Sequence, residues 1–512
     1  MNRGVRAALL LLACAVSGCS NQPQADAGVI VVGIASGPND LDPRFGTDDA
    51  SDRMQRLIFD NFMELDEHLR VVPKLADALT HPDPLTYVAT VRRGVRFHDG
   101  HELTAADVAF TFGQFLDPAF VSPRKGGYQQ LESVTATDPY TVVFRLRQPF
   151  ASFPINLMMP IVEQGAGANL RERPIGTGPY KFVRYRVDDR VELEANADYW
   201  GGAPANRGLT IRVVPDDVMR GLELRKGTLD LVVNDTAPDI VSQMREDSRL
   251  QVVESPGVDY QYIGINTRDT ILSDRRVRQA IACAVDRDAI VKYLRRGLAT
   301  PAAGMLPELS WAALSGEDAF PYDPRRAQTL LDDAGYTDPD GSGPLTRFRL
   351  TLKVSNNEYN RLQSTVIQEN LRAVGIDLDV RTYEFATLYA DVIAGNFQLF
   401  TLQWTSGALA DPDILRRVFH CDQAPPAGFN RGRYCNRAVD AALNQADSTE
   451  EPEARRKVYE DVQRLVAQDA PYISLWHKTN VAVGQRSLSG ITLSPIADFS
   501  FLRGVARRAS AH

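Results

Sequence analysis

Residues 258–294 read VDYQYIGINTRDTILSDRRVRQAIACAVDRDAIVKYL, and this stretch decides the fold. Its first part, 258–266, alternates and is rich in β-branched and aromatic residues, which predicts a strand. Ser273 and Asp274 then offer side-chain oxygens to the free amides of a helix start. The next apolar residues recur at the spacing of one buried helix face: Val277, Ile281, Ala284 and Val285. An α/β pattern lies on each side of this stretch. We therefore interpret 258–294 as the segment where the chain passes from one lobe to the other, called the handover stretch below, and as the back wall of a cleft.

The bulk composition excludes several classes of protein. A chain of 512 residues is too long for one hydrophobic core, so two or three lobes are expected. The net charge of −8 argues against nucleic acid and against a polybasic membrane patch. No internal apolar run approaches the ~20 residues that span a bilayer. We therefore expect the chain beyond its N-terminus to form a soluble protein.

The N-terminus has the pattern of an export signal. Arg3 and Arg6 precede an apolar run, 7–16, that has the length of a secretory core. The run ends in Val-Ser-Gly before Cys19, which resembles a bacterial lipobox. This predicts a signal peptide at 1–18, lipid on Cys19, a tether at 19–28 and a place in the periplasm or cell envelope, anchored to a membrane. An ordinary signal peptide cut nearby is the alternative, and inner against outer membrane stays open.

Three cysteines remain in the exported part of the chain. Cys421 and Cys435 flank a Pro- and Gly-rich loop, and in an oxidising compartment they predict a disulfide. A metal site that also uses His420 is the alternative, although the spacing matches no zinc pattern. Cys283 lies within the apolar face of the handover helix and is expected to be an inert buried thiol.

A first ligand-contacting loop is predicted near the start of the mature chain. Val29–Ile34 is a short apolar run typical of a doubly buried strand, and the loop 35–43 that follows is full of turn formers. In open α/β sheets ligands bind beside such loops. Ser36, Asn39 and Asp40 are therefore candidate ligand contacts, and a plain connection is an equally open alternative.

Motifs for catalysis and for cofactors are missing from the sequence. Residues 176–180, GTGPY, contain a G-x-G, but Pro179 makes them a turn into a strand rather than a phosphate cradle before a helix. There is no Gly-x-Ser-x-Gly elbow, no His-Glu-x-x-His and no P-loop. We expect no enzyme, no cofactor and no metal.

Six stretches together resemble the solute-binding proteins of ABC importers for peptides and nickel, the bacterial extracellular family 5. They are FHDGHELTAADVAFTF (97–112), GTGPYKF (176–182), NADYWGGAPANRGLTIRVVPD (196–216), RVRQAIACAVDR (276–287), YDPRRAQTLLDDAGY (322–336) and the strand that ends at Trp404. Each is weak alone, but their shared order is specific and spans nearly the whole exported chain.

The resemblance implies an α/β protein with the two-lobed fold of type II periplasmic binding proteins. Lobe I would be 29–265, with an extra subdomain at about 46–172; lobe II would be 266–480; and 481–512 would return to lobe I. It also implies the substrate-binding component of an ABC importer, a monomer that captures a peptide or peptide-like solute and delivers it to a permease and its ATPase. An exported lipoprotein with a chaperone or adhesin role and a periplasmic hydrolase are the competing functions.

The resemblance also directs attention to further residues of the ligand site. Tyr260, Tyr262 and Trp404 offer large faces that would enclose a ligand, although each also fits a lobe core, and Asn234 and Ser406 are further candidates. Peptide binders of the family often carry an Asp three residues after this Trp, paired with the ligand's α-ammonium group.

That position is Gly407 here, with Asp411 four residues further on. Since a buried ammonium without a partner costs several kcal/mol, either Asp411 replaces the anchor or the ligand is no free-amine peptide. The identity of the ligand and of the permease is also left open.

Overall fold

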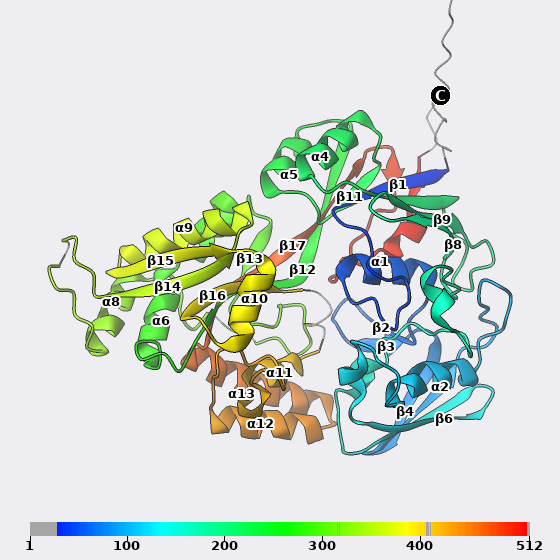
Figure 1. Cartoon of the computed structure of the whole chain (residues 1–512), viewed down its shortest axis with the longest axis horizontal. Helices are drawn as coiled ribbons and strands as arrows, with labels where there is room; N and C mark the ends of the chain where they lie inside the picture. The colour runs from blue at the N-terminus through cyan, green and yellow to red at the C-terminus, as the bar shows by residue number, and fades with distance from the viewer. Residues whose placement is uncertain are drawn as a thin grey trace, which may run out of the picture.

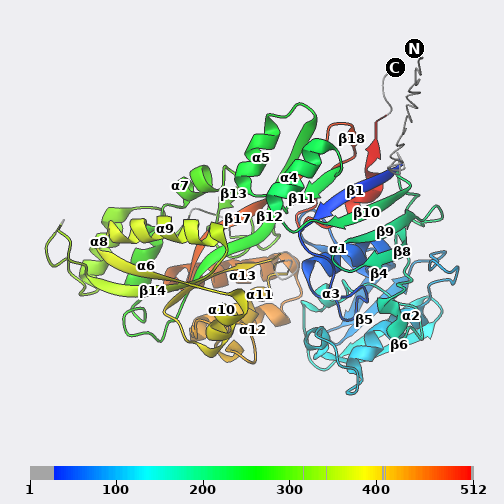
Figure 2. The same cartoon turned by 45° about the horizontal axis from the view of Figure 1, so that its top comes forward.

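The computed structural model describes residues 28–314, 316, 318–341, 343–405, 409 and 411–508. These residues form two α/β lobes that lie side by side and share two long strands (Figures 1 and 2). Within the described residues one sheet of 11 strands runs through both lobes, in the order β15-β14-β16-β12-β17-β11-β1-β10-β9-β8, with β13 paired to β17. The expected two-lobed α/β architecture is therefore present.

Lobe I is built on the strands nearest the N-terminus. The apolar run predicted as a buried strand is β1 (Val29–Ile34), which pairs in parallel with β10 and β11. The other strands of this half are β8 (Tyr180–Arg186), β9 (Arg190–Ala195), β10 (Gly208–Val213) and β11 (Leu231–Val233). Its helices are α1 (Asp49–Ile58), α4 (Asp217–Lys226) and α5 (Pro238–Arg245), and the small pair β18 (Leu488–Ser489) and β19 (Ala506–Arg507) ends the described chain.

A separate four-stranded sheet forms the subdomain of lobe I. Its strands are β4 (Ala76–Asp83), β5 (Thr86–Val91), β7 (Thr141–Leu146) and β6 (Leu131–Asp138), in that order, beside α2 (Ala105–Gly113) and α3 (Phe153–Asn156). A capping box opens α2, where the Thr104 amide donates to Asp107 Oδ2 at 2.7 Å. The hairpin of β2 (Met63–Leu65) and β3 (Val71–Pro73) links the subdomain to the rest of the lobe.

Lobe II contains a β-α-β unit. In this unit β14 (Phe348–Ser355) and β15 (Ile376–Tyr383) pair in parallel around α9 (Glu358–Arg372). The remaining strands are β13 (Ala299–Pro301) and β16 (Leu399–Trp404). The remaining helices are α6 (Arg275–Ala284), α7 (Arg287–Ala289), α8 (Pro324–Asp333), α10 (Phe385–Ala394), α11 (Ile414–Phe419), α12 (Arg437–Ser448) and α13 (Pro452–Asp469).

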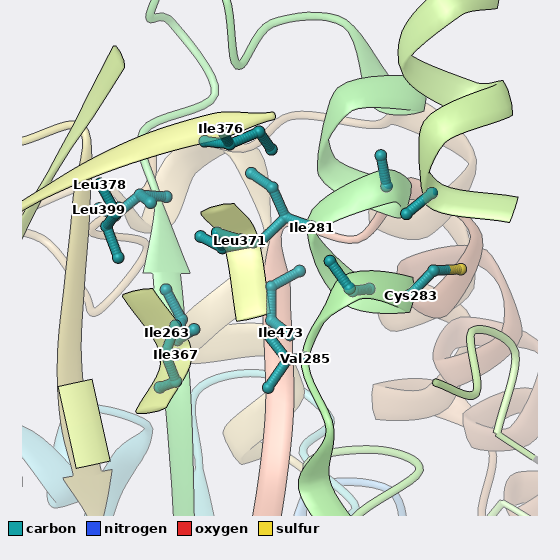
Figure 3. Packing of buried hydrophobic residues seen from close by; sticks show 14 of the residues in the cluster. Ile263, Ile281, Cys283, Val285, Ile367, Leu371, Ile376, Leu378, Leu399 and Ile473 are labelled. Carbon is teal, nitrogen blue, oxygen red and sulfur yellow. The ribbon is translucent and has the colours of Figure 1, made fainter. Parts of the chain in front are cut away.

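The handover stretch folds as its pattern predicts. Asp274 caps α6, accepting a hydrogen bond from the Arg276 amide at 2.8 Å, and Ile281 and Cys283 on the apolar face are fully buried. Figure 3 shows this face packed against side chains of β12, α9, β15, β16 and β17, among them Ile263, Leu371 and Ile473. The helix thus anchors the core of lobe II, and the predicted inert thiol of Cys283 is buried there.

Two long strands, β12 (Leu250–Ile265) and β17 (Tyr472–Gln485), connect the lobes. They pair with each other along most of their length, and the register shifts between Pro256 and Tyr260. From Tyr260 onward β12 also pairs with β16 of lobe II, so the passage between lobes lies before this residue. The predicted limits at 265 and 480 stay predictions, and the strand pairing favours a change near the register shift.

Candidate functional site

A cavity of about 520 Å³ lies between the two lobes. One wall comes from the first turns of α1 and from the subdomain, at Arg124, Tyr128 and Asn156. The other wall comes from lobe II, at Thr405, Asp411, Asp413, Arg417 and Phe429. Pockets of this volume hold small-molecule ligands, and a site walled by both lobes changes whenever the lobes move.

Charged side chains of α1 line the lobe I wall. The helix begins at its cap Asp48, and two acid–arginine pairs one turn apart follow, Asp49–Arg53 at 2.8 Å and Asp52–Arg56 at 2.7 Å. Burial alone would raise the pKa of Asp52, but its pair with Arg56 lowers that pKa. The charges of these aspartates and arginines therefore offset each other in the cavity wall.

Sequence reasoning missed this wall. Apolar residues recur at helical spacing over 54–62 of the sequence and predict a helix there, whereas α1 spans Asp49–Ile58. The difference arises because the first turn of α1 is charged and its cap precedes the apolar stripe. The spacing of acid and arginine four residues apart in 49–56 was the available signal. Phe62, placed in that predicted helix, is instead buried in the subdomain core.

On the lobe II wall, two carboxylates follow Thr405 and stand at the start of α11. Asp411 Oδ1 accepts the Asp413 amide at 2.8 Å, and Asp413 Oδ2 lies 3.5 Å from Arg417 Nε. Burial raises the pKa of Asp411, and the nearby Arg455 partly opposes that rise. The wall thus presents two poorly solvated carboxylates, each with an arginine of lobe II nearby.

Direct contacts join the lobes beside this wall. Ser152, just before α3, donates to Asp411 Oδ1 at 2.8 Å and accepts a hydrogen bond from the Arg455 guanidinium. The amide of Ala151 donates to the Asp447 carbonyl at 3.1 Å. Figures 1 and 2 show α12 and α13 (orange) beside the subdomain, in agreement with these bonds. The structure therefore shows the lobes in contact around the cavity.

Of the predicted ligand contacts that the structure describes, Asp411 lines the cavity. Trp404 is 8% exposed and packs edge-on against Phe429, which does line it, with ring centroids 5.3 Å apart. Ser406, Gly407 and the lipid-attachment candidate Cys19 lie outside the described residues.

The two tyrosines of the handover strand lie inside lobe II. Tyr260 and Tyr262 are 1% and 0% exposed and stack on each other, and the Tyr260 hydroxyl pairs with Ser474 Oγ at 2.7 Å. No described residue of 258–294 is among those that line the cavity, and the place of this stretch at the back of a cleft stays a prediction. Both faces of β12 are covered by protein from Tyr260 onward, because the tyrosines pack in one apolar cluster of lobe II and Ile263 and Ile265 pack in another.

The remaining candidates support local structure. Ser36 and Asn39 are exposed, and Asp40 pairs with Arg171 at 3.0 Å; none of the three lines the cavity. Asn234 exchanges bonds with β17, donating to Asn480 Oδ1 at 3.0 Å and accepting the Val481 amide at 2.9 Å. A role for these residues in binding stays a prediction, and the structure favours the lobe II acids over them.

The cysteine prediction is confirmed. Cys421 and Cys435 form a disulfide, which excludes their use as thiolate ligands beside His420. His420 instead lies against Asp422, with Nδ1 and Oδ1 2.5 Å apart. The predicted turn at 176–180 is also confirmed: the chain passes directly into β8, and the Gly178 amide donates to the carbonyl that ends α1 at 2.9 Å.

Comparison with known proteins gives a consistent picture. The model of the bacterial extracellular solute-binding proteins, family 5, matches residues 70–426. The oligopeptide-binding protein AppA of Bacillus subtilis is 30% identical over 96% of this chain and 95% of its own. This chain belongs to that family.

The structures of relatives carry the same fold. AppA of Bacillus subtilis in complex with a nonapeptide matches with a TM-score of 0.77 at 28% identity, over 94% of this chain and 99% of that one. NikZ of Campylobacter jejuni in complex with Ni(L-His) matches with a TM-score of 0.79 at 25% identity, over 94% and 100%. The two-lobed type II fold expected from the sequence is thereby confirmed, and the family is one of solute-binding proteins rather than enzymes.

Family membership also agrees with an extracellular or periplasmic place of action. In the part of the chain that the structure describes, no helix is long and apolar enough to cross a bilayer.

Proposed function

We propose that this protein is the solute receptor of an ABC importer and that it binds a short peptide between its lobes for delivery to a membrane permease. The observation that carries the proposal is the cavity lined by both lobes, with carboxylates and arginines together in its wall. A peptide with free ends carries one charge of each sign, so such a wall matches both of its ends. AppA of Bacillus subtilis and the di/tripeptide-binding protein 2 of Pseudomonas aeruginosa, 29% identical over 98% of each chain, support this ligand class.

The proposal is tested by native mass spectrometry of the protein purified from its own host, followed by titration with a defined library of di- and tripeptides. A bound peptide should raise the free energy of unfolding by about 2.7 kcal/mol at a hundredfold excess over Kd. The peptide should be recovered intact, since the protein is proposed to bind without turnover. Absence of stabilisation by every library member, or recovery of a cleaved peptide, would contradict the proposal.

Attachment of the protein to a membrane by a lipid is part of the same proposal. The sequence Val-Ser-Gly-Cys at 16–19 supports attachment of lipid to Cys19, which would hold a monomeric receptor near its permease. Expression in a bacterial host with an alkyne-labelled fatty acid should label the wild type and leave Cys19→Ala unlabelled. A labelled variant would remove Cys19 from this role, and sedimentation of the unlipidated protein would report its oligomeric state.

A further inference from the structure

One buried arginine of lobe II has no anionic partner among the described residues. Arg431 is 6% exposed, and its Nη1 and Nη2 donate to the hydroxyls of Tyr262 and Tyr389 at 3.1 and 3.2 Å. Its Nε is buried without an acceptor, and no described carboxylate lies within 4.0 Å of the guanidinium. Burial of a cation costs free energy unless an opposite charge or several strong acceptors replace its water. Two neutral phenol oxygens meet this need only in part.

The surroundings of Arg431 differ from those of comparable arginines. Arg220 and Arg278 are 4% and 5% exposed, and each donates to three backbone carbonyls. Arg431 donates to no backbone carbonyl in the part of the chain that the structure describes. Its guanidinium carbon instead lies near three ring centroids, those of Trp404 (4.9 Å), Tyr389 (5.2 Å) and Phe429 (5.7 Å). Ring faces attract a cation, but they leave its charge uncompensated.

A second buried donor lies beside this guanidinium. Trp404 is 8% exposed, and its indole Nε1 finds no acceptor among the described residues. Phe429 separates both donors from the interlobe cavity: its partly buried ring lines the cavity and packs against Trp404 and Arg431. Two buried N–H donors, one of them charged, match the oxygens of a carboxylate.

We propose that Arg431 and Trp404 bind the carboxylate side chain of an acidic residue of the ligand, which reaches them from the interlobe cavity past Phe429. The inference rests on the proposed function and adds the substrate class, short peptides that contain Glu or Asp. The carboxylate neutralises the guanidinium and accepts hydrogen bonds from the two unpaired donors. An acidic peptide therefore removes a cost that the free protein bears, whereas a Gln side chain of the same size brings no charge.

The test compares alanine tripeptides that carry a single Glu, at each of the three positions, with the same tripeptides that carry Gln. The two members of a pair have identical free ends, so the ratio of their affinities reports the side-chain carboxylate alone. Isothermal titration measures both affinities. Since hydrogen bonds to charged groups are strong, wild type should bind the Glu member about tenfold to a hundredfold more tightly at one position or more.

Three variants of the two proposed residues separate charge from packing. Arg431→Met keeps an unbranched side chain among the rings and should bring the ratio to within about threefold of one. Arg431→Lys retains a positive charge and should keep part of the preference for Glu. Trp404→Phe keeps a ring, loses the N–H donor and should lower the ratio by about threefold to tenfold.

Arg417→Met is the matched control. Arg417 also lines the cavity, but it lies 3.5 Å from Asp413, so this variant should keep the wild-type ratio even where overall affinity falls. The ratio measured within one variant does not depend on the fraction of protein that is folded.

The outcomes distinguish this inference from the proposed function. If wild type binds none of the peptides, the peptide function itself is wrong. If wild type binds both members of every pair equally, the function stands and the preference for acidic peptides is wrong. Retention of the Glu preference in Arg431→Met would remove Arg431 from this role, and its loss in Arg417→Met instead would transfer the role to Arg417.

Discussion

Substitution of Ser152 by alanine should weaken ligand binding without disturbing either lobe. The hydroxyl of Ser152 is 2.8 Å from Asp411 Oδ1 and also accepts a bond from Arg455, so one side chain of lobe I links two charged groups of lobe II. Alanine removes both bonds and adds no bulk. Because each lobe keeps its own core, the change acts on the equilibrium between open and closed forms.

The size of the effect follows from the chemistry of the contact. A hydrogen bond to a charged group contributes about 1.5–3 kcal/mol, and water replaces part of this when the lobes separate. We take about 2 kcal/mol for the two bonds together, which corresponds to a roughly 30-fold fall in the closure constant. If the open form dominates without ligand, Kd should rise by the same factor of about 30.

Isothermal titration with a library peptide measures Kd, and small-angle scattering of the free protein measures closure. The control is Ser364→Ala, since Ser364 is fully buried in α9 and its hydroxyl donates within that helix, to the Asn360 carbonyl at 2.7 Å. The control should change stability slightly and leave Kd unchanged. A Kd for Ser152→Ala within threefold of wild type, in free protein that scattering shows to be open, would refute the reasoning.

Three further substitutions test the fold and its electrostatics. Replacement of Cys421 and Cys435 by serine should lower the free energy of unfolding by about 3 kcal/mol in a urea titration, because their disulfide closes a loop of 14 residues; a loss below about 1 kcal/mol would contradict this. Gly178→Ala should cost more than about 2 kcal/mol, since its Cβ would lie 2.5 Å from the backbone of α1, whereas Gly126→Ala, with nothing within 4 Å, should be tolerated; equal melting temperatures would show the packing argument to be wrong. Burial raises the pKa of Asp447 to about 6, so the folded protein holds this proton between about pH 4 and 6, and stability gains as pH falls through that range. Asp447→Asn should remove that part of the gain, and parallel stability curves for variant and wild type between pH 4 and 7 would rule out the assignment.

The sequence predicts the fold well where local chemistry and burial point in the same direction. At α6, the cap Asp274 and the apolar face with Ile281 specify one helix in one orientation, and the structure has both. The unit from β14 to β15 is equally plain, because two strands in which apolar and polar residues alternate flank a single amphipathic helix. These features depend on residues that are close together in the chain, so they can be recognised in a single sequence.

The residues that line the cavity are harder to predict from the sequence, because they come from distant parts of the chain. Arg124 belongs to a turn of the subdomain and Asp413 to the start of α11, and nothing in their sequence neighbourhoods relates them. Aromatic residues were favoured as ligand contacts, yet Tyr260 and Tyr262 have the same alternation that specifies core. Alternation shows that a face is buried, but not whether protein or ligand buries it.

Polar and apolar contacts of different kinds join the two lobes of this molecule. Between the lobes β12 and β17 lose register near Gly257, whose missing Cβ leaves room for the Lys478 carbonyl, so bending there breaks few bonds. Leu69, at the tip of the β2–β3 hairpin, is 1% exposed and packs in an apolar cluster of lobe II. This apolar contact draws the lobes together but does not fix their orientation. Ser152 then adds a directional bond, which fixes how the walls face each other. A ligand that contacts both walls of the cavity would act on the same equilibrium, by the difference in its binding free energy between the closed and open forms.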